Sequence, residues 1–178
     1  TNGTFLRAVM HVGENISEGG RVGEGSVQHL SGVLGAMGLE TGRLKTGTPP
    51  RLDRSSIDWD RLTIQRPDPE PDGFSHWRDP PRREWMNCHV TRTNESVHDV
   101  IRSHLHRSPM YSGQIEGIGP RYCPSIEDKV VRFPDRTGHT IHLEREGLQS
   151  RSVYVNGIST SLPADAQEQL VARIPGLE

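Results

Sequence analysis

Thr4-Phe-Leu-Arg-Ala-Val-Met-His-Val12 leads through a glycine-rich stretch, residues 13–25, into the segment Ser26–Met37. The first part has the apolar content of a buried strand. The third part has its apolar residues at helical spacing, and Gly38 is a suitable stop for that helix. A strand, a glycine-rich loop and a helix in this order indicate the beginning of an α/β arrangement.

The rest of the chain predicts a mixture of helices and strands. Asn94 is a typical N-cap for a helix whose apolar residues fall on one face. Pro163 is a favoured first residue of another helix, which would reach about Arg173. The predicted strands are residues 39–44, 88–93, 129–133, 139–143 and 152–155, and the last three would form a meander.

Loops and turns take an unusually large part of this sequence. Residues 53–84 are polar and rich in proline, and they suit a linker, a mobile loop or the rim of an inserted subdomain. The chain contains 31% hydrophobic residues, 5% aromatic residues, 19 glycines and 13 prolines, whereas Gly and Pro together usually make up ~12%. Few core residues indicate a segment that packs against something else. We expect an α+β fold, or part of a larger α/β protein with an insertion.

Charge and cysteine content limit the possible functions. The net charge is −2 and the pI is about 6.5, whereas a dedicated nucleic-acid domain is usually more basic. Local basic clusters still leave RNA contact open; they are Arg78 with Arg82 and Arg83, and Arg102 with His104, His106 and Arg107. The 2 cysteines provide neither a disulfide framework nor zinc spacing, which fits a reducing cytoplasm.

Metal and membrane functions are not expected. The pairs His104/His106 and His139/His142 lack an evident third ligand, so we assign no metal. No apolar run approaches the ~20 residues that a membrane-spanning helix needs.

The stretch Gly117-Ile-Gly-Pro-Arg-Tyr-Cys-Pro-Ser-Ile-Glu-Asp-Lys129 is the main candidate site. It places one thiol, Cys123, between the cations Arg121 and Lys129, which favour the reactive thiolate. Glu127 and Asp128 are able to move protons or to fix those cations. The structural alternatives are a buried cysteine and plain salt bridges among the four charged residues.

Two glycine-rich stretches resemble phosphate loops. Gly19–Gly25 precedes the predicted helix start at Ser26, where backbone N–H groups would be able to approach a phosphate, although the residues alone favour a flexible loop. In Gly42-Arg-Leu-Lys-Thr-Gly47, the lysine precedes the second glycine, so a Walker A interpretation fails.

Ser108–Val130 resembles the signature of the MnmG/GidA family of flavoproteins, which modify the wobble uridine of certain tRNAs. Other matching motifs occur in the same order and extend the resemblance over nearly the whole chain. They are residues 3–6, 19–21, 42–51 and 156–163.

The resemblance implies an α/β fold with an α+β insertion, part of a Rossmann-like FAD-binding domain plus an inserted subdomain. The chain would be a central slice of the enzyme. Residues 1–50 would belong to the FAD-binding domain, residues 51–118 to the inserted subdomain, and residues 119–178 to the returning FAD-binding domain. The implied partners are tRNA, the GTPase MnmE and a second copy in a homodimer. The implied cofactors are FAD and NADH, with methylenetetrahydrofolate as one-carbon donor and ammonium or glycine as nitrogen source.

The resemblance also assigns site residues. Cys123 would add to the uracil ring, with Arg121 or Lys129 as donor to a ring oxygen and Glu127 or Asp128 as proton shuttle. Asn156 and Ser159 would lie near the flavin edge. A flavin-contacting serine of the family falls in register on Val27, next to Ser26, while Cys88 more simply packs in a strand. The segment implied to bind nicotinamide dinucleotide comprises Gly119, Pro120, Arg121, Tyr122, Cys123, Pro124, Ser125, Ile126, Glu127, Asp128, Lys129, Val130, Val131, Arg132 and Phe133.

Two further functions remain open at this point. A folate- and flavin-dependent tRNA uracil methyltransferase would share the thiol chemistry, although Ser108–Lys129 fits the MnmG type better. The other alternative is an inactive module that binds tRNA or a partner protein.

Overall fold

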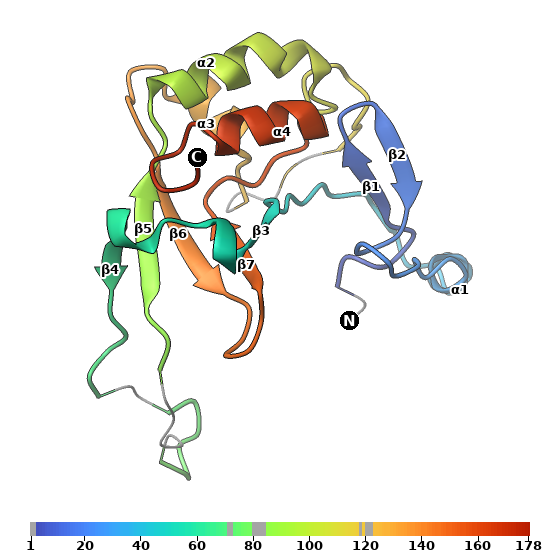
Figure 1. The fold of residues 1–178 in the computed structure, drawn as a ribbon. Coiled ribbons are helices and arrows are strands. Elements are labelled where there is room, and N and C mark those ends of the chain that lie inside the picture. Colours follow the sequence, from blue (N-terminus) through green and yellow to red (C-terminus); the bar gives the residue numbers. More distant parts are fainter. Residues whose placement is uncertain (1–2, 71–72, 80–84, 118, 120–122) are drawn as a thin grey trace.

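The computed structural model describes residues 3–70, 73–79, 85–117, 119 and 123–178. A five-stranded sheet, with helices packed over it, forms the larger part of the fold (Figure 1). The strand order is β3-β7-β6-β5-β4, and every pairing in this sheet is antiparallel. Its strands are β3 (Arg51–Asp53), β4 (Thr63–Gln65), β5 (Cys88–Arg92), β6 (Thr140–Arg145) and β7 (Ser152–Asn156).

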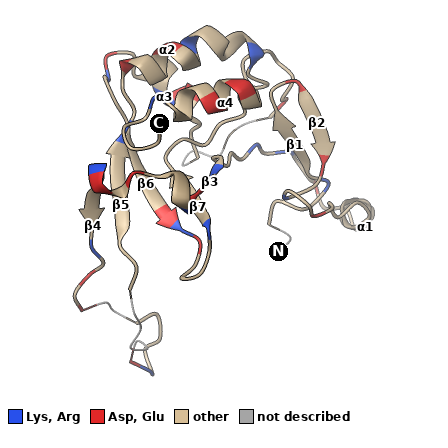
Figure 2. Cartoon of the chain, viewed as in Figure 1, with Lys and Arg blue, Asp and Glu red and all other residues tan. Residues whose placement is uncertain are grey.

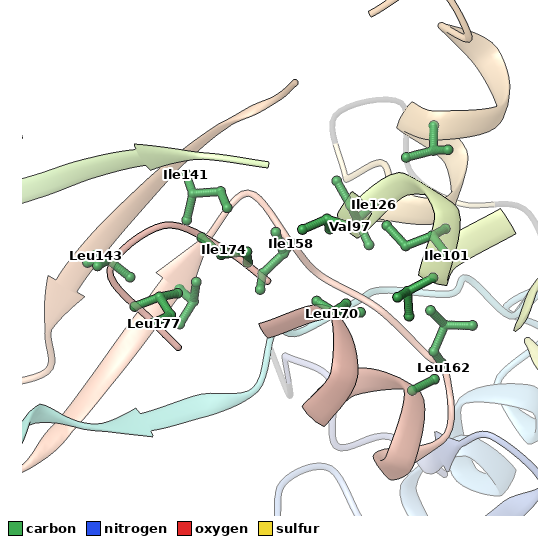
Figure 3. Close-up of a cluster of buried hydrophobic side chains, with 14 of the residues drawn as sticks. Val97, Ile101, Ile126, Ile141, Leu143, Ile158, Leu162, Leu170, Ile174 and Leu177 are labelled. Atoms are coloured by element: carbon green, nitrogen blue, oxygen red, sulfur yellow. The ribbon is translucent and has the colours of Figure 1, made fainter. Parts of the chain in front are cut away.

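The helices α2 (Glu95–His104), α3 (Ile126–Arg132) and α4 (Ala164–Val171) bury their apolar sides together with one face of the sheet. Figure 3 shows two connected parts of this core, one beside the strands and one between the helices. The fully buried large apolar side chains are Ile101, Ile126, Ile141, Leu143, Ile158, Leu162, Leu170 and Ile174. Burial of this apolar surface is the main stabilising contribution to the fold.

Local sequence explains these elements. In β6, Ile141 and Leu143 alternate with half-buried residues, as a strand with one buried face requires. At the start of α2, the Asn94 side chain accepts a hydrogen bond of 3.0 Å from the backbone N–H of Val97. The predictions of a strand at residues 88–93 and of a helix after Asn94 are confirmed.

The N-terminal part is built differently. It contains the hairpin of β1 (Val9–Val12) and β2 (Asn15–Glu18) and the short helix α1 (Leu30–Ala36). In Figure 1 the hairpin lies beside the helices and α1 lies at the periphery. The hairpin is joined to the core by a hydrogen bond of 2.8 Å from the N–H of Gly13 to the carbonyl of Ser161. Gly13 has a φ of +55°, and a Cβ there would lie 2.7 Å from Pro163.

Several predicted elements are wrong. Of the predicted strand at residues 4–12 only β1 forms, and its partner is the following strand. The helix predicted at Ser26–Met37 begins at Leu30, and residues 39–44 form no strand. Residues 129–133 do not form a strand either, because α3 occupies Ile126–Arg132 and the Ser125 cap starts a helix there.

Residues 53–70 are more ordered than a linker. They form two 3₁₀ turns, Arg54–Ser56 and Trp59–Arg61, and then the edge strand β4. Ile57 and Leu62 belong to the core. The two edge strands, β3 and β4, are three residues long each. Prolines adjoin both, at positions 49 and 50 before β3 and at 67 and 69 after β4.

The fold is thus a combination of helices and a sheet, as predicted, and strands from residues 51–118 and 119–178 share one sheet. The division at residues 1–50, 51–118 and 119–178 stays a prediction, as does the inserted subdomain. Figure 2 shows basic and acidic residues interspersed along the chain. Among the described residues, no helix is long and apolar enough to cross a membrane.

Candidate functional site

The first turn of α3 organises the candidate site. The Ser125 hydroxyl accepts a hydrogen bond of 3.1 Å from the N–H of Asp128, and an Asp128 carboxylate oxygen accepts one of 3.2 Å from the N–H of Ser125. This reciprocal capping box fixes the beginning of the helix. Cys123 lies two positions before the capping residue, so the box also fixes the end of the loop that carries the thiol.

Asp128 makes two further contacts with distant parts of the chain. The Lys45 ammonium lies 3.3 Å from its Oδ2, and the side chains of these two residues are only 9% and 11% exposed. The Tyr111 hydroxyl donates to Oδ1 at 3.2 Å. Burial raises the pKa of Asp128, but the Lys45 charge and the Ser125 hydrogen bonds outweigh it, so that this pKa lies below its ordinary value. Burial and the Asp128 charge raise the pKa of Tyr111 to about 12.

Glu127 points into the interior and joins three segments. Its side chain is fully buried. Oε1 accepts hydrogen bonds from the Thr160 hydroxyl at 3.0 Å, the Ser161 N–H at 3.1 Å and the Ser108 hydroxyl at 3.4 Å. Oε2 is buried without a hydrogen-bond partner among the described residues. This carboxylate therefore holds α3 against the loop that follows β7.

Lys129 is engaged by the backbone. Its ammonium donates a hydrogen bond of 2.8 Å to the carbonyl of Gly157, and burial lowers the pKa of this lysine. Gly157 has a φ of +111°, and a Cβ there would lie 2.7 Å from the carbonyl oxygen of Thr140. Only glycine fits this position, which presents the carbonyl that receives Lys129.

The Cys123 thiol is half-buried and contacts the loop before β3. Its Sγ lies 3.7 Å from Oγ1 of Thr46. The neighbouring residues Pro120, Arg121 and Tyr122 lie outside the described part of the chain, so their predicted roles stay predictions.

The structure brings in residues that sequence reasoning missed. These are Lys45 and Thr46 from the loop before β3, Ser108 and Tyr111 after α2, and Thr160 after β7. The available signal was their position inside the motifs at residues 42–51, 108–130 and 156–163. Those motifs meet around α3, although they are far apart along the chain.

The other predicted binding residues are distributed between the core and the surface. Ile126 and Val130 belong to the core, whereas Val131, Arg132 and Phe133 are exposed. The side-chain amide of Asn156 donates to Glu144 at 3.0 Å, on β6. Ser159 lies beside α3, because its carbonyl accepts a hydrogen bond of 2.8 Å from Ile126.

Two other predicted contacts, Ser26 and Val27, belong to the N-terminal part. Val27 pairs with Phe5 through a backbone hydrogen bond of 2.7 Å, and Ser26 precedes it without beginning a helix.

The remaining two predicted residues, Gly119 and Pro124, belong to the segment before α3. Pro124 directly precedes the cap of α3, and a Cβ added at Gly119 would lie 2.7 Å from the Lys45 side chain.

Among the described residues, neither the predicted dinucleotide-binding segment 119–133 nor the glycine-rich stretch 13–25 fits a phosphate cradle. At α3, the N–H groups of Ile126 and Asp128 already donate to Ser159 and Ser125. After the glycine-rich stretch 13–25, the helix α1 begins only at Leu30. We therefore derive no chemical step through FAD or NADH. No group of three or more possible metal ligands occurs within the described ranges.

The comparisons with known proteins agree with this arrangement. The family model of the glucose inhibited division protein A, GidA, matches residues 1–178. The chain belongs to the GidA family. Two solved structures of Aquifex aeolicus GidA share the fold, each over 99% of this chain. Form I has a TM-score of 0.86 at 45% identity, and form II has 0.84 at 40%.

The chain is also similar in sequence to curated proteins that carry an enzyme name. The chain is 56% identical over 178 residues to the tRNA uridine 5-carboxymethylaminomethyl modification enzyme MnmG of Rhodopirellula baltica, covering 100% of the chain and 27% of that protein. It is 54% identical over 180 residues to the MnmG of Granulibacter bethesdensis, covering 99% and 28%. The chain thus spans between a quarter and a third of the length of these GidA proteins.

Proposed function

We propose that this chain forms the thiol-bearing part of a tRNA-modifying enzyme that adds the carboxymethylaminomethyl group at C5 of the wobble uridine. The observation that carries the proposal is the match of the whole chain to enzymes of that designation at above 50% identity. The geometry around Cys123 supports it, because a half-buried thiol two positions before the capped start of α3 suits covalent addition to a ring.

The proposed chemistry begins at the Cys123 thiolate. Its sulfur adds to C6 of the uracil, while the C5–C6 π pair moves toward the ring carbonyl and leaves an enolate with a nucleophilic C5. C5 then attacks the methylene carbon of a methylene-bearing electrophile of the folate class, and the displaced electron pair goes to the folate nitrogen. Loss of the C5 proton expels that nitrogen as tetrahydrofolate and leaves an exocyclic methylene on C5. The amine of glycine adds to this methylene carbon and loses a proton, and expulsion of the thiolate from C6 restores the C5–C6 double bond and returns Cys123 unchanged.

The charged residues of the site divide into holding and reacting groups. Glu127 is fully buried and accepts three hydrogen bonds on one oxygen, so we assign it to holding the loops. Lys129 is engaged by Gly157, which leaves Arg121 as the candidate donor to a uracil oxygen. Asp128 is the other carboxylate of this stretch, lies five positions after the thiol and is the candidate to receive the C5 proton.

The cofactors, partners and location of the whole enzyme follow from the family resemblance. We propose FAD and NADH as cofactors and methylenetetrahydrofolate as the one-carbon donor. We also propose action on tRNA together with the GTPase MnmE, a homodimeric enzyme, and a cytoplasmic location. Flavin absorbance of the purified protein would test the assignment of FAD. Copurification of the protein with the GTPase would test the assignment of MnmE as a partner.

Replacing Cys123 by alanine in the intact protein tests the thiol chemistry. We expect loss of the modified nucleoside, measured by mass spectrometry of tRNA, with an unchanged circular dichroism spectrum. Cys88→Ser is the matched control and should retain activity, because burial and the Glu144 charge raise the pKa of Cys88 and disfavour its thiolate. Full activity of Cys123→Ala would exclude the thiol mechanism.

The two alternatives give different results in the same assays. A tRNA uracil methyltransferase would use the same thiol but add a single methyl group, which the product mass distinguishes. A binding module would bind tRNA in a salt-dependent manner, would take up no flavin and would be indifferent to Cys123→Ala.

A further inference from the structure

The loop before β3 forms a second wall of the site, and four consecutive residues build it. Lys45 pairs with Asp128 at 3.3 Å, and Thr46 lies 3.7 Å from the Cys123 sulfur. A Cβ at residue 47 would lie 3.1 Å from Cβ of Ser159. Residue 48 accepts a backbone hydrogen bond of 3.3 Å from Thr160. Each residue from 45 to 48 therefore contacts α3 or the segments beside it.

These neighbours fix the position of Thr46. On one side, the nearly buried Lys45 side chain passes Gly119, where a Cβ would lie 2.7 Å from its Cε, and its ammonium reaches Asp128. It thus contacts the chain both before and after Cys123. On the other side, the bridge between Thr48 and Thr160 ties the loop to the segment after β7. A hydroxyl held in this way is preorganised relative to the thiol.

We propose that Thr46 donates its hydroxyl hydrogen to the Cys123 thiolate and is a catalytic residue of the proposed reaction, with Lys45 as a positioning residue for it. The inference rests on the proposed function. Sulfur is larger than oxygen, so 3.7 Å from Oγ1 to Sγ is within reach of an O–H···S hydrogen bond. A donor stabilises negative charge on sulfur before addition and again when the thiolate is expelled.

The nearest alternative is that Thr46 is only part of a structural loop. A purely structural role would change stability and would leave the reactivity of the thiol in the folded protein unaltered. The reactivity of Cys123 therefore separates the two roles, and it is measurable without tRNA or cofactor.

The experiment compares Thr46→Val with Thr46→Ser in the intact protein carrying Cys88→Ser, which removes the other cysteine of this chain. Valine keeps the shape and removes the hydroxyl, whereas serine keeps the hydroxyl. The probe is iodoacetamide at neutral pH, with the alkylated peptide quantified by mass spectrometry. Circular dichroism and urea unfolding confirm that each variant is folded.

Thr46→Val should slow alkylation by about 1.5- to fourfold, and Thr46→Ser should stay near the parent rate. The fall is expected because loss of a net hydrogen bond of about 0.5–1.5 kcal/mol reduces the thiolate fraction. The accompanying gain in nucleophilicity recovers only about half of the effect. Lys45→Met should also slow alkylation, and Lys45→Arg should restore part of the rate.

Two results would overturn the inference. One is an equal alkylation rate in Thr46→Val and the parent protein, and the other is an equal loss of rate in the valine and serine variants. Because alkylation needs no turnover, failure of the proposed function would appear separately as unchanged tRNA product in Cys123→Ala. If both the thiol mechanism and the contact hold, Thr46→Val should lower kcat more than it raises KM.

Discussion

The two ends of the chain are held together by different means. In the described part of the molecule, every core side chain lies at or beyond Ile57, whereas α1 buries none of its residues. The apolar residues of the N-terminal part, including Val22, Val33 and Met37, are largely exposed. The later region is thus stabilised by burial, and the earlier one by local hydrogen bonds and a few ties to the core.

The candidate site lies where these two regions meet. Lys45 and Thr46 belong to the loop that connects them, and both contact the loop and helix that contain Cys123 and Asp128. The comparison teaches that Cys123 borders α3 on the well-packed side and contacts, through Thr46, a segment with little core of its own. Four perturbations, from the largest expected effect to the smallest, test that contrast.

The largest effect should come from the core. Ile101→Ala removes a fully buried side chain from α2 and should lower the free energy of unfolding by about 2–5 kcal/mol, through lost burial and the cavity left behind. The matched change in the N-terminal part is Val33→Ala on α1, which should stay within about 0.5 kcal/mol. Urea unfolding followed by circular dichroism measures both. Similar losses in the two variants would contradict the division into two regions.

The buried carboxylate of Glu127 should come next. Glu127→Ala leaves the Ser108 hydroxyl, the Thr160 hydroxyl and the Ser161 N–H without their acceptor, at an expected cost of about 2–3 kcal/mol. The matched control is Glu168→Ala on α4. Because Glu168 is exposed, this variant should change the free energy of unfolding little. A shift in the thermal unfolding midpoint reports the difference. A stable Glu127→Ala protein would mean that α3 is not held through this contact.

The histidines near the start of α2 should make the core region sensitive to pH. Burial lowers the pKa of His98 below the usual 6.5. The pKa of His139 is lowered too, mainly by burial and to a smaller extent by the charges of His98 and other nearby cations. As the pH falls, these two histidines are therefore protonated in the unfolded chain at a higher pH than in the folded protein. Their contribution to the free energy of unfolding is complete above pH 6.5 and declines as the pH falls below that value. The decline should approach about 1.4 kcal/mol per pH unit for each histidine.

Unfolding midpoints in urea at pH 8 and pH 5.5 measure this dependence. His98→Gln should reduce it, whereas the exposed His106 has no buried ring, so His106→Gln should leave it unchanged. A parent protein whose stability is equal at the two pH values would refute the assignment.

The smallest effect should come from the charges of the N-terminal part. Arg21 and Glu24 are 3.5 Å apart with side chains 74% and 52% exposed, so Arg21→Ala should change the free energy of unfolding by less than about 0.5 kcal/mol. The same urea titration suffices. A larger loss would indicate that the hairpin and its turns depend on this pair.

Sequence reasoning located the elements whose signals are local. Asn94 marked the start of α2, and the strands predicted at residues 88–93, 139–143 and 152–155 correspond to β5, β6 and β7. It failed at residues 129–133, where a short apolar run was interpreted as a strand although Ser125 and Asp128 form a capping box. Short apolar runs fit either structure, and the cap decides between them.

The same limit applies to the site. Cys123, Glu127 and Asp128 stood out because they are dense in chemistry over a few positions. Lys45 and Thr46 did not, because their contacts with Asp128 and Cys123 span 83 and 77 positions of the chain. Pairings of that kind depend on tertiary packing and leave no periodic signal.

The edges of the five-stranded sheet have a consequence for the behaviour of the protein in concentrated solution. An unpaired edge strand offers its backbone to a strand from another molecule, which is a common start of aggregation. Here both edges are three residues long, and prolines at positions 49, 50, 67 and 69 lack the N–H that would extend a ladder. The sheet is therefore protected from edge-to-edge association at both margins by the sequence that enters and leaves it.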